Sequence, residues 1–171
     1  MHVKDLASIT GQIISMSIAV GNITRLLTRS CYATIEKRTS WNDTLHINTE
    51  VRSELEVWLG HIDSLNGIPM HPKSSAVGIV FSDASDHGFG GYTVKCGNNL
   101  VSGTWGPKVL GSSSTKREIL AVKYVLLSLV DRLSGLTLKW FSDNQNVPRI
   151  IQCGSAKDYL QSEALSIFSI C

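Results

Sequence analysis

The sequence predicts an α/β fold: a helical N-terminal segment followed by a mixed sheet with the element order β-β-β-α-β-α-α. The run Ala76–Phe81 has no polar side chain and contains β-branched residues, which is typical of a buried strand. Apolar residues recur at spacings of three and four over residues 114–133, which indicates a long helix. Between residues 68 and 75 the pattern has two prolines, two serines and no periodicity, so the helical and sheet parts are expected to divide there.

Residues 1–72 are expected to form a separate helical domain. The first helix has one apolar face, which breaks at Gly21-Asn22, and a second helix follows to about Cys31. The third helix is expected over residues 49–66, capped by Asn48 or Thr49 and stopped by Asn66-Gly67. Its apolar stripe consists of Val51, Leu55, Trp58, Leu59, Ile62 and Leu65. Basic residues lie off the apolar face of the second helix, and they fit either contact with phosphates or an ordinary solvated face: Arg25, Arg29, Lys37 and Arg38.

The second domain, residues 76–171, begins with three consecutive strands. We expect them over residues 76–82, 91–95 and 100–105, with a hairpin turn at Gly97-Asn98-Asn99. Glycines at positions 88, 90 and 91 are interpreted as a tight turn that also allows a close backbone approach.

The rest of this domain alternates helix and strand. A helix over residues 114–133 leads to a fourth strand over 136–141, which, like the first, closes on a Ser-Asp pair. A short helix to about Cys153, capped by Asn144, and a last helix from Lys157 follow. Pro148 lies in the short helix, where it would remove a hydrogen bond unless it falls in the first turn.

The composition is that of an ordinary folded chain. Its 171 residues carry a net charge of +2, which is compatible with nucleic acid but also with a plain surface. None of the four cysteines forms a C-x-x-C pair, which argues against zinc. No signal peptide and no run approaching roughly 18 apolar residues is evident, so we expect an intracellular protein without a membrane partner.

Three carboxylates occupy special places in this pattern. Asp83 ends the first strand, Asp143 ends the fourth, and Glu118 lies near the start of the long helix. Each has a simpler explanation: Asp is common in turns, and Glu118 could close a capping box with Thr115, unless Ser114 is the N-cap. Brought together, three acids would repel one another unless a cation were present. Mg²⁺ suits such oxygen ligands, and two ions about 3.5–4 Å apart can support phosphodiester cleavage.

Three motifs follow one another in the second domain: Asp83-Ala84-Ser85 with Gly88-x-Gly90-Gly91, Ser113-Ser114-Thr115-x-x-Glu118, and Phe141-Ser142-Asp143-Asn144. By this ordered set the chain resembles a type 1 ribonuclease H domain, as found behind the reverse transcriptase of retroelements. The resemblance covers residues 76–171, and its details are closest to DIRS-like or related elements.

The resemblance implies a function. In that family, acids at the positions of Asp83, Glu118 and Asp143 bind two Mg²⁺ ions (Mn²⁺ being an alternative) and hydrolyse the RNA strand of an RNA–DNA hybrid. By their place near the three acids, Ser85, Asn144 and Gln145 are expected to touch the hybrid, although turn and cap roles explain the first two as well. The partners implied are the hybrid and the remainder of a reverse transcriptase polyprotein. Residues 1–72 would correspond to the thumb or connection, and no Tyr-x-Asp-Asp polymerase motif occurs.

The family pattern also continues beyond what this sequence contains. It has a fifth strand and a further helix with a fourth carboxylate, expected after Cys171, so the sequence predicts a truncated domain with weakened catalysis. The alternative is a catalytically inactive module of the same fold that binds nucleic acid or a partner chain. A sugar-kinase or actin-like phosphate-binding fold needs a second lobe, for which the chain has no room.

Overall fold

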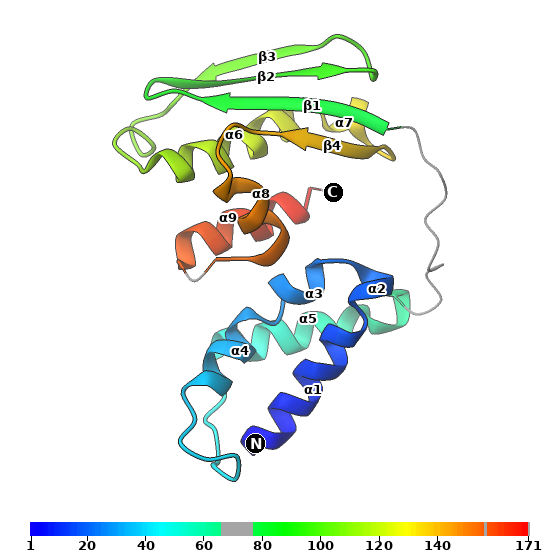
Figure 1. Ribbon diagram of the computed structural model, residues 1–171, viewed down its shortest axis with the longest axis vertical. Coiled ribbons are helices and arrows are strands. Elements are labelled where there is room, and N and C mark those ends of the chain that lie inside the picture. Colours follow the sequence, from blue (N-terminus) through cyan, green and yellow to red (C-terminus); the bar gives the residue numbers. More distant parts are fainter. Residues whose placement is uncertain (66–76, 156, 171) are drawn as a thin grey trace. The chain divides into compact units, whose positions relative to one another are not determined.

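The computed structural model describes residues 1–65, 77–155 and 157–170 of the chain (Figure 1). It divides into two compact units, Met1–His71 and Pro72–Cys171. The predicted helix stop at Asn66-Gly67 and the predicted linker over 68–75 lie outside the described residues.

Five helices make up the first unit in its described part: α1 Val3–Ser15, α2 Ser17–Val20, α3 Ile23–Leu26, α4 Arg29–Glu36 and α5 Thr49–Leu65. Its core joins α1, α4 and α5 through Val3, Leu6, Cys31, Ile35 and Val51. Asn48 caps α5, since its Oδ1 accepts from the Val51 amide at 2.9 Å. Glu54 of α5 accepts the Ser30 and Cys31 amides at 2.8 and 3.1 Å, which satisfies the N-terminus of α4.

Two expectations for this unit were wrong. The first helix ends at Ser15 rather than at Gly21, so Val20 belongs to the separate α2. The predicted second helix to about Cys31 is divided into two, because α3 ends at Leu26 and α4 begins at Arg29. The predicted stripe on α5 is partly buried: Val51 and Trp58 are in the core, whereas Leu59 is 78 % exposed. Periodicity predicts which residues share a face of a helix, whereas tertiary packing decides how much of that face is buried.

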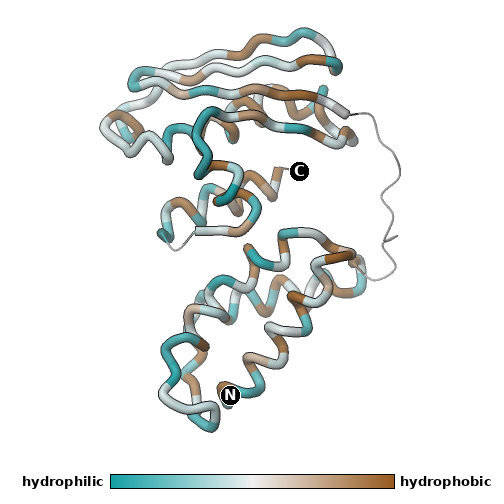
Figure 2. Tube along the Cα trace, in the orientation of Figure 1, coloured by the Kyte–Doolittle hydropathy of each residue, from teal (hydrophilic) through white to brown (hydrophobic). Residues whose placement is uncertain are grey.

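The second unit is built on a four-stranded sheet in the order β3-β2-β1-β4. The strands are β1 Val77–Ala84, β2 Gly88–Val94, β3 Leu100–Thr104 and β4 Thr137–Phe141. β1 pairs antiparallel with β2 and parallel with β4, and β2 pairs antiparallel with β3. The apolar start of β1 is brown in Figure 2. The predicted mixed sheet is confirmed, and its strand order is consistent with the ribonuclease H-like fold expected from the sequence.

The glycines after Asp83 do not form the turn. β2 already begins at Gly88, and the turn is limited to residues 85–87. A Cβ at Gly88 would lie 2.3 Å from the carbonyl oxygen of Gly103, and one at Gly91 would lie 2.5 Å from a methyl group of Val125. These glycines are therefore required for close packing inside the unit rather than for a change of direction.

Helix α6, Ser114–Ser128, covers one face of the sheet, packed against β1 and β2 (Figure 1). Its buried residues include Ile119, Val122, Val125 and Leu126. The predicted single helix over 114–133 is interrupted at Leu129, after which α7 spans Val130–Leu133. β4 follows, then α8 Asn146–Cys153 and α9 Asp158–Phe168. Pro148 is the third residue of α8, in the first turn, where its missing amide breaks no helical bond.

The opposite face of the sheet carries a ladder of aromatic rings. Phe81 stacks against Tyr92 with ring centroids 4.7 Å apart and against Phe141 at 4.9 Å. Tyr92 and Phe141 remain 45 % and 39 % exposed. None of the helices in the described ranges has the length and apolar composition that crossing a bilayer requires.

Candidate metal centre

The register between β1 and β4 places two aspartates together. Phe81 pairs with Phe141 in the parallel ladder, and Asp83 and Asp143 each lie two residues further along. Side chains two residues apart in a strand share a face, and parallel strands end at the same edge of a sheet. Both carboxylates are exposed. The strand pairing therefore sets the separation between these two acids.

The third acid comes from the helix on the covered face. Glu118 is only 5 % exposed. Carboxylate oxygens of Glu118, Asp83 and Asp143, one from each, all lie within 4.8 Å of one another. The three acids thus converge at the edge of the sheet from β1, from α6 and from the segment after β4.

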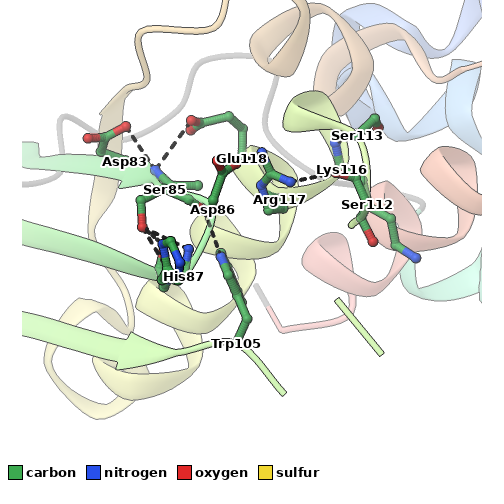
Figure 3. Close-up of polar contacts among 12 residues, drawn as sticks. Asp83, Ser85, Asp86, His87, Trp105, Ser112, Ser113, Lys116, Arg117 and Glu118 are labelled. Carbon is green, nitrogen blue, oxygen red and sulfur yellow. Dashed lines mark hydrogen bonds and ion pairs between the residues drawn. The ribbon is translucent and has the colours of Figure 1, made fainter. Parts of the chain in front are cut away.

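Glu118 reaches this point because it is not part of the helix cap. The N-cap is Ser113, whose side chain accepts the Lys116 amide at 3.3 Å. Both predicted caps, Thr115 and Ser114, were wrong, so Glu118 lies two residues beyond the capping-box position. The Glu118 carboxylate makes no bond to the N-cap residue and points toward the end of β1 (Figure 3).

Few hydrogen bonds stabilise this cluster. The Ala84 amide donates to Asp83 Oδ1 at 2.8 Å and to Glu118 Oε1 at 3.3 Å. The hydroxyl of Ser142 donates to Glu118 Oε2 at 3.4 Å. Ser142 belongs to the predicted Ser-Asp pair, but its contact with Glu118 was not foreseen, because it depends on how α6 crosses the sheet.

The cluster favours a proton or a cation on Glu118. Burial raises its pKa to about 7, and the negative charges of Asp143 and then Asp83 act in the same direction. The bonds from Ala84 and Ser142 lower the pKa and offset only part of this effect. A carboxyl group near half-protonation at neutral pH is easily ionised when a cation binds beside it.

The donor set fits a hard metal ion. All three side chains supply oxygen, which suits Mg²⁺, Ca²⁺ or Mn²⁺ rather than the softer metals that favour sulfur or imidazole. In the described part of the chain, this is the group of acidic, histidine or cysteine side chains close enough to hold an ion. The three acids therefore form a candidate metal centre.

The three residues expected to touch substrate lie around this centre with different local roles. Ser85 Oγ accepts the amides of His87 and Gly88 at 3.2 and 3.0 Å within the turn. Asn144 Oδ1 accepts the Asn146 amide at 3.0 Å at the start of α8. Gln145 is exposed and makes no side-chain cap. Turn bonds thus account for Ser85 and Asn144. The predicted cap at Asn144 was wrong, because the N-cap of α8 is Gln145, whose exposed side chain makes no cap bond.

Several contacts that support the centre join residues far apart in the sequence. The Trp105 indole nitrogen donates to the Ser85 carbonyl at 2.9 Å, and that of Trp140 donates to Ser82 Oγ at 2.9 Å. Arg117 pairs with Asp86 across the β1–β2 turn. These partners are 20 or more residues apart, so no local pattern reveals them.

A cavity of about 520 Å³ adjoins the acids on the open face of the sheet. Aromatic and aliphatic side chains line most of it, and Asp83 and Asp143 are also among its lining residues. Its apolar lining is Phe81, Tyr92, Leu100 and Phe141. The two exposed carboxylates are therefore accessible from this face of the sheet.

Comparison with known proteins identifies no family. No protein-family model matches the chain, and no curated protein matches it. Three solved structures of the foamy viral protease-reverse transcriptase are similar to it. The complex with dsDNA has 13% identity and a TM-score of 0.38, and covers 72% of this chain and 26% of that one.

The other two structures extend over more of this chain. The dRH form with ds DNA has 15% identity and a TM-score of 0.43, and the match covers 97% of this chain and 32% of the viral chain. The complex with an RNA/DNA hybrid has 14% identity and a TM-score of 0.40, and the match covers 96% of this chain and 23% of the viral chain. This chain thus spans a third or less of those structures, and no activity is assigned from them.

Proposed function

We propose that this chain hydrolyses phosphodiester bonds in the RNA strand of RNA–DNA hybrids, using divalent cations bound by Asp83, Glu118 and Asp143. The observation that carries the proposal is the convergence of these three carboxylates, within 4.8 Å of one another, at the ends of the parallel strands β1 and β4. The order of the surrounding motifs, which resembles that of type 1 ribonuclease H domains, supports the choice of substrate.

Each acid has a distinct part in this proposal. Asp83 and Asp143 are exposed, so they can bind a cation that still carries water or a substrate phosphate. Glu118 is buried and lies on the helix that covers the sheet, so it can supply the third ligand oxygen from that covered face. Bound Mg²⁺, as a pair of ions, would activate water and stabilise the leaving oxygen.

The rigid sheet is what makes this arrangement suitable for catalysis. Two of the acids lie on or directly after paired strands, and the third lies on a helix packed against them. Sites on such elements hold their geometry more closely than sites on loops. Gln145, exposed at the start of α8 near Asp143, is the most accessible of the three predicted substrate contacts.

The proposal extends to the context of the chain. We infer that the helices of residues 1–72 form a thumb- or connection-like part of a retroelement reverse transcriptase, and that the chain acts as one portion of such a polyprotein. The foamy viral structures to which this chain is similar are complexes with ds DNA or an RNA/DNA hybrid.

The test is cleavage of a labelled RNA–DNA hybrid by the full chain in Mg²⁺ and, separately, in Mn²⁺. Asp83→Asn is the decisive variant, because asparagine has nearly the same shape but cannot supply an anionic ligand. Asp131→Asn is the matched control, because Asp131 is an exposed aspartate on α7 away from the cluster. We expect cleavage by the parent and by Asp131→Asn, and a loss of at least about 100-fold in Asp83→Asn.

Three results would contradict the proposal in different ways. Equal cleavage by Asp83→Asn and its parent would show that this carboxylate is a turn residue. Binding of the hybrid without any cleavage, in either metal, would favour the alternative function of an inactive nucleic-acid-binding module. Cleavage of double-stranded DNA in preference to the hybrid would replace the proposed substrate.

A further inference from the structure

The turn that follows Asp83 is anchored from outside by three contacts. Trp105 donates from its indole nitrogen to the Ser85 carbonyl and from its amide to the His87 carbonyl, both at 2.9 Å. Arg117 binds the side chain of Asp86. Figure 3 shows Arg117 between the turn and the start of α6. The turn is therefore tied both to the end of β3 and to the helix that carries Glu118.

Arg117 makes this second connection with two branches of its guanidinium. Its Nη2 donates to Asp86 Oδ1 at 2.5 Å, and its Nη1 donates to the Ser112 carbonyl at 2.6 Å. Its side chain is only 14 % exposed, whereas that of Asp86 is 76 % exposed. The planar guanidinium can bind two acceptors in fixed directions, which a lysine ammonium on a flexible stem does not reproduce.

This placement has an energetic cost. The Nε atom of Arg117 is buried and has no hydrogen-bond partner. A buried donor without a partner is destabilising by roughly 1–3 kcal/mol. Because Asp86 is exposed to solvent, its ion pair with Arg117 contributes little to the free energy of unfolding. Stability of the fold is therefore a weak explanation for a buried arginine here.

We propose that Arg117 is a positioning residue that fixes the separation between Asp83 and Glu118. Arg117 directly precedes Glu118 in the chain. Its ion pair with Asp86 holds the turn at a point three residues after Asp83. The bond from the Ala84 amide to Glu118, at 3.3 Å, lies within the same closed loop of contacts. This inference rests on the proposed function, since it assigns Arg117 a role in assembling the metal centre.

Electrostatics and positioning predict opposite results for the loss of Arg117. If only its charge mattered, removing a positive charge beside three carboxylates would strengthen the binding of a cation. If its bonds set the geometry of the carboxylates, removing it would weaken that binding. Groups that orient metal ligands typically contribute about 10- to 100-fold to metal affinity.

The experiment measures Mn²⁺ and Mg²⁺ affinity of the full chain by calorimetric titration, with melting temperatures recorded for every variant. We expect Arg117→Met to weaken binding about tenfold or more. Arg117→Lys keeps the charge but not the two-branched geometry, and we expect an intermediate loss. Arg132→Met removes the same charge from an exposed position on α7 and should leave the affinity unchanged.

Unchanged or tighter binding by Arg117→Met, or an equal loss in Arg132→Met, would overturn the inference. If the parent binds neither cation, the proposed function fails, and hydrogen exchange in the metal-free protein then tests the positioning role. We expect the Ala84 and Ser85 amides to exchange faster in Arg117→Met and Arg117→Lys, with the Val80 amide in the same strand unchanged. Equal rates at Ala84 and Ser85 in variants and parent would overturn the inference by this second measurement.

Discussion

Phe81 of β1 and Phe141 of β4 are direct partners in a parallel pair, and their rings stack at 4.9 Å. The aspartate that follows each of them by two residues is thereby brought to the same end and face of the sheet. The repeated Phe-Ser-Asp triplets of the two strands are thus the local cause of the acidic cluster. Glu118 is the part of the cluster that strand pairing does not supply.

Gly91→Ala should strongly destabilise the second unit. A Cβ there would lie 2.5 Å from a methyl group of Val125 and 2.8 Å from the Phe81 carbonyl oxygen, which belongs to backbone and cannot move aside cheaply. We expect a loss of about 2–3 kcal/mol in the free energy of unfolding, measured by urea denaturation. Gly90→Ala is the matched control, because its nearest neighbour would be the Val101 carbonyl at 3.7 Å. A similar loss in both variants would show that α6 does not pack as closely as described.

The metal-free protein should lose stability as the pH rises through neutrality. Glu118 has a pKa of about 7 in the folded state against 4.5 as its ordinary value. Between these values the folded state binds more protons than the unfolded state, so the free energy of unfolding falls with rising pH. The full effect is at most about 3 kcal/mol and is complete above the folded-state pKa. Denaturation at pH 5, 6, 7 and 8 in the presence of a chelator measures it.

Glu118→Gln separates this contribution from other titrating groups. The amide is never charged, so the variant should show a flatter pH profile and be more stable than the parent at pH 8 by about 1–3 kcal/mol. Glu56→Gln, an exposed position on α5, makes the same chemical change without the burial and should follow the parent's profile. A steep profile that persists in Glu118→Gln would assign the pH dependence to another residue.

Mg²⁺ should stabilise the fold in a pH-dependent way. A bound cation requires Glu118 to be ionised, so its affinity should increase as the pH passes about 7. We expect Mg²⁺ at about 10 mM to raise the melting temperature more at pH 8 than at pH 5.5. Asp143→Asn should remove this increment. Replacing Mg²⁺ by Ca²⁺ tests whether the three carboxylates select a cation by its size. An equal rise in melting temperature with Na⁺ at matched ionic strength would show that salt screens the negative charges, without a cation binding at the site.

The sequence by itself determined the four strands of the second unit, though not the interruption at Leu129 of the helix predicted over 114–133, and it singled out the three acids as candidates. Apolar runs and their periodicity predicted all four strands, and the two Ser-Asp endings singled out Asp83 and Asp143. These signals are local, because burial on both faces of a central strand and on one face of a helix imposes a pattern on consecutive residues. The same local reasoning misplaced the cap of α6 and assigned Gly88 to a turn, because a nearby serine or glycine fits several short-range patterns equally well.

Only the tertiary structure decided how the acids meet and what supports them. The register of β1 against β4 sets the spacing of the two aspartates, and the packing of α6 on the sheet buries Glu118 and raises its pKa. The contacts of Arg117 with Asp86 and of Trp105 with Ser85 join residues 31 and 20 positions apart. Their strength depends on distance and burial in space, which no periodicity along the chain encodes.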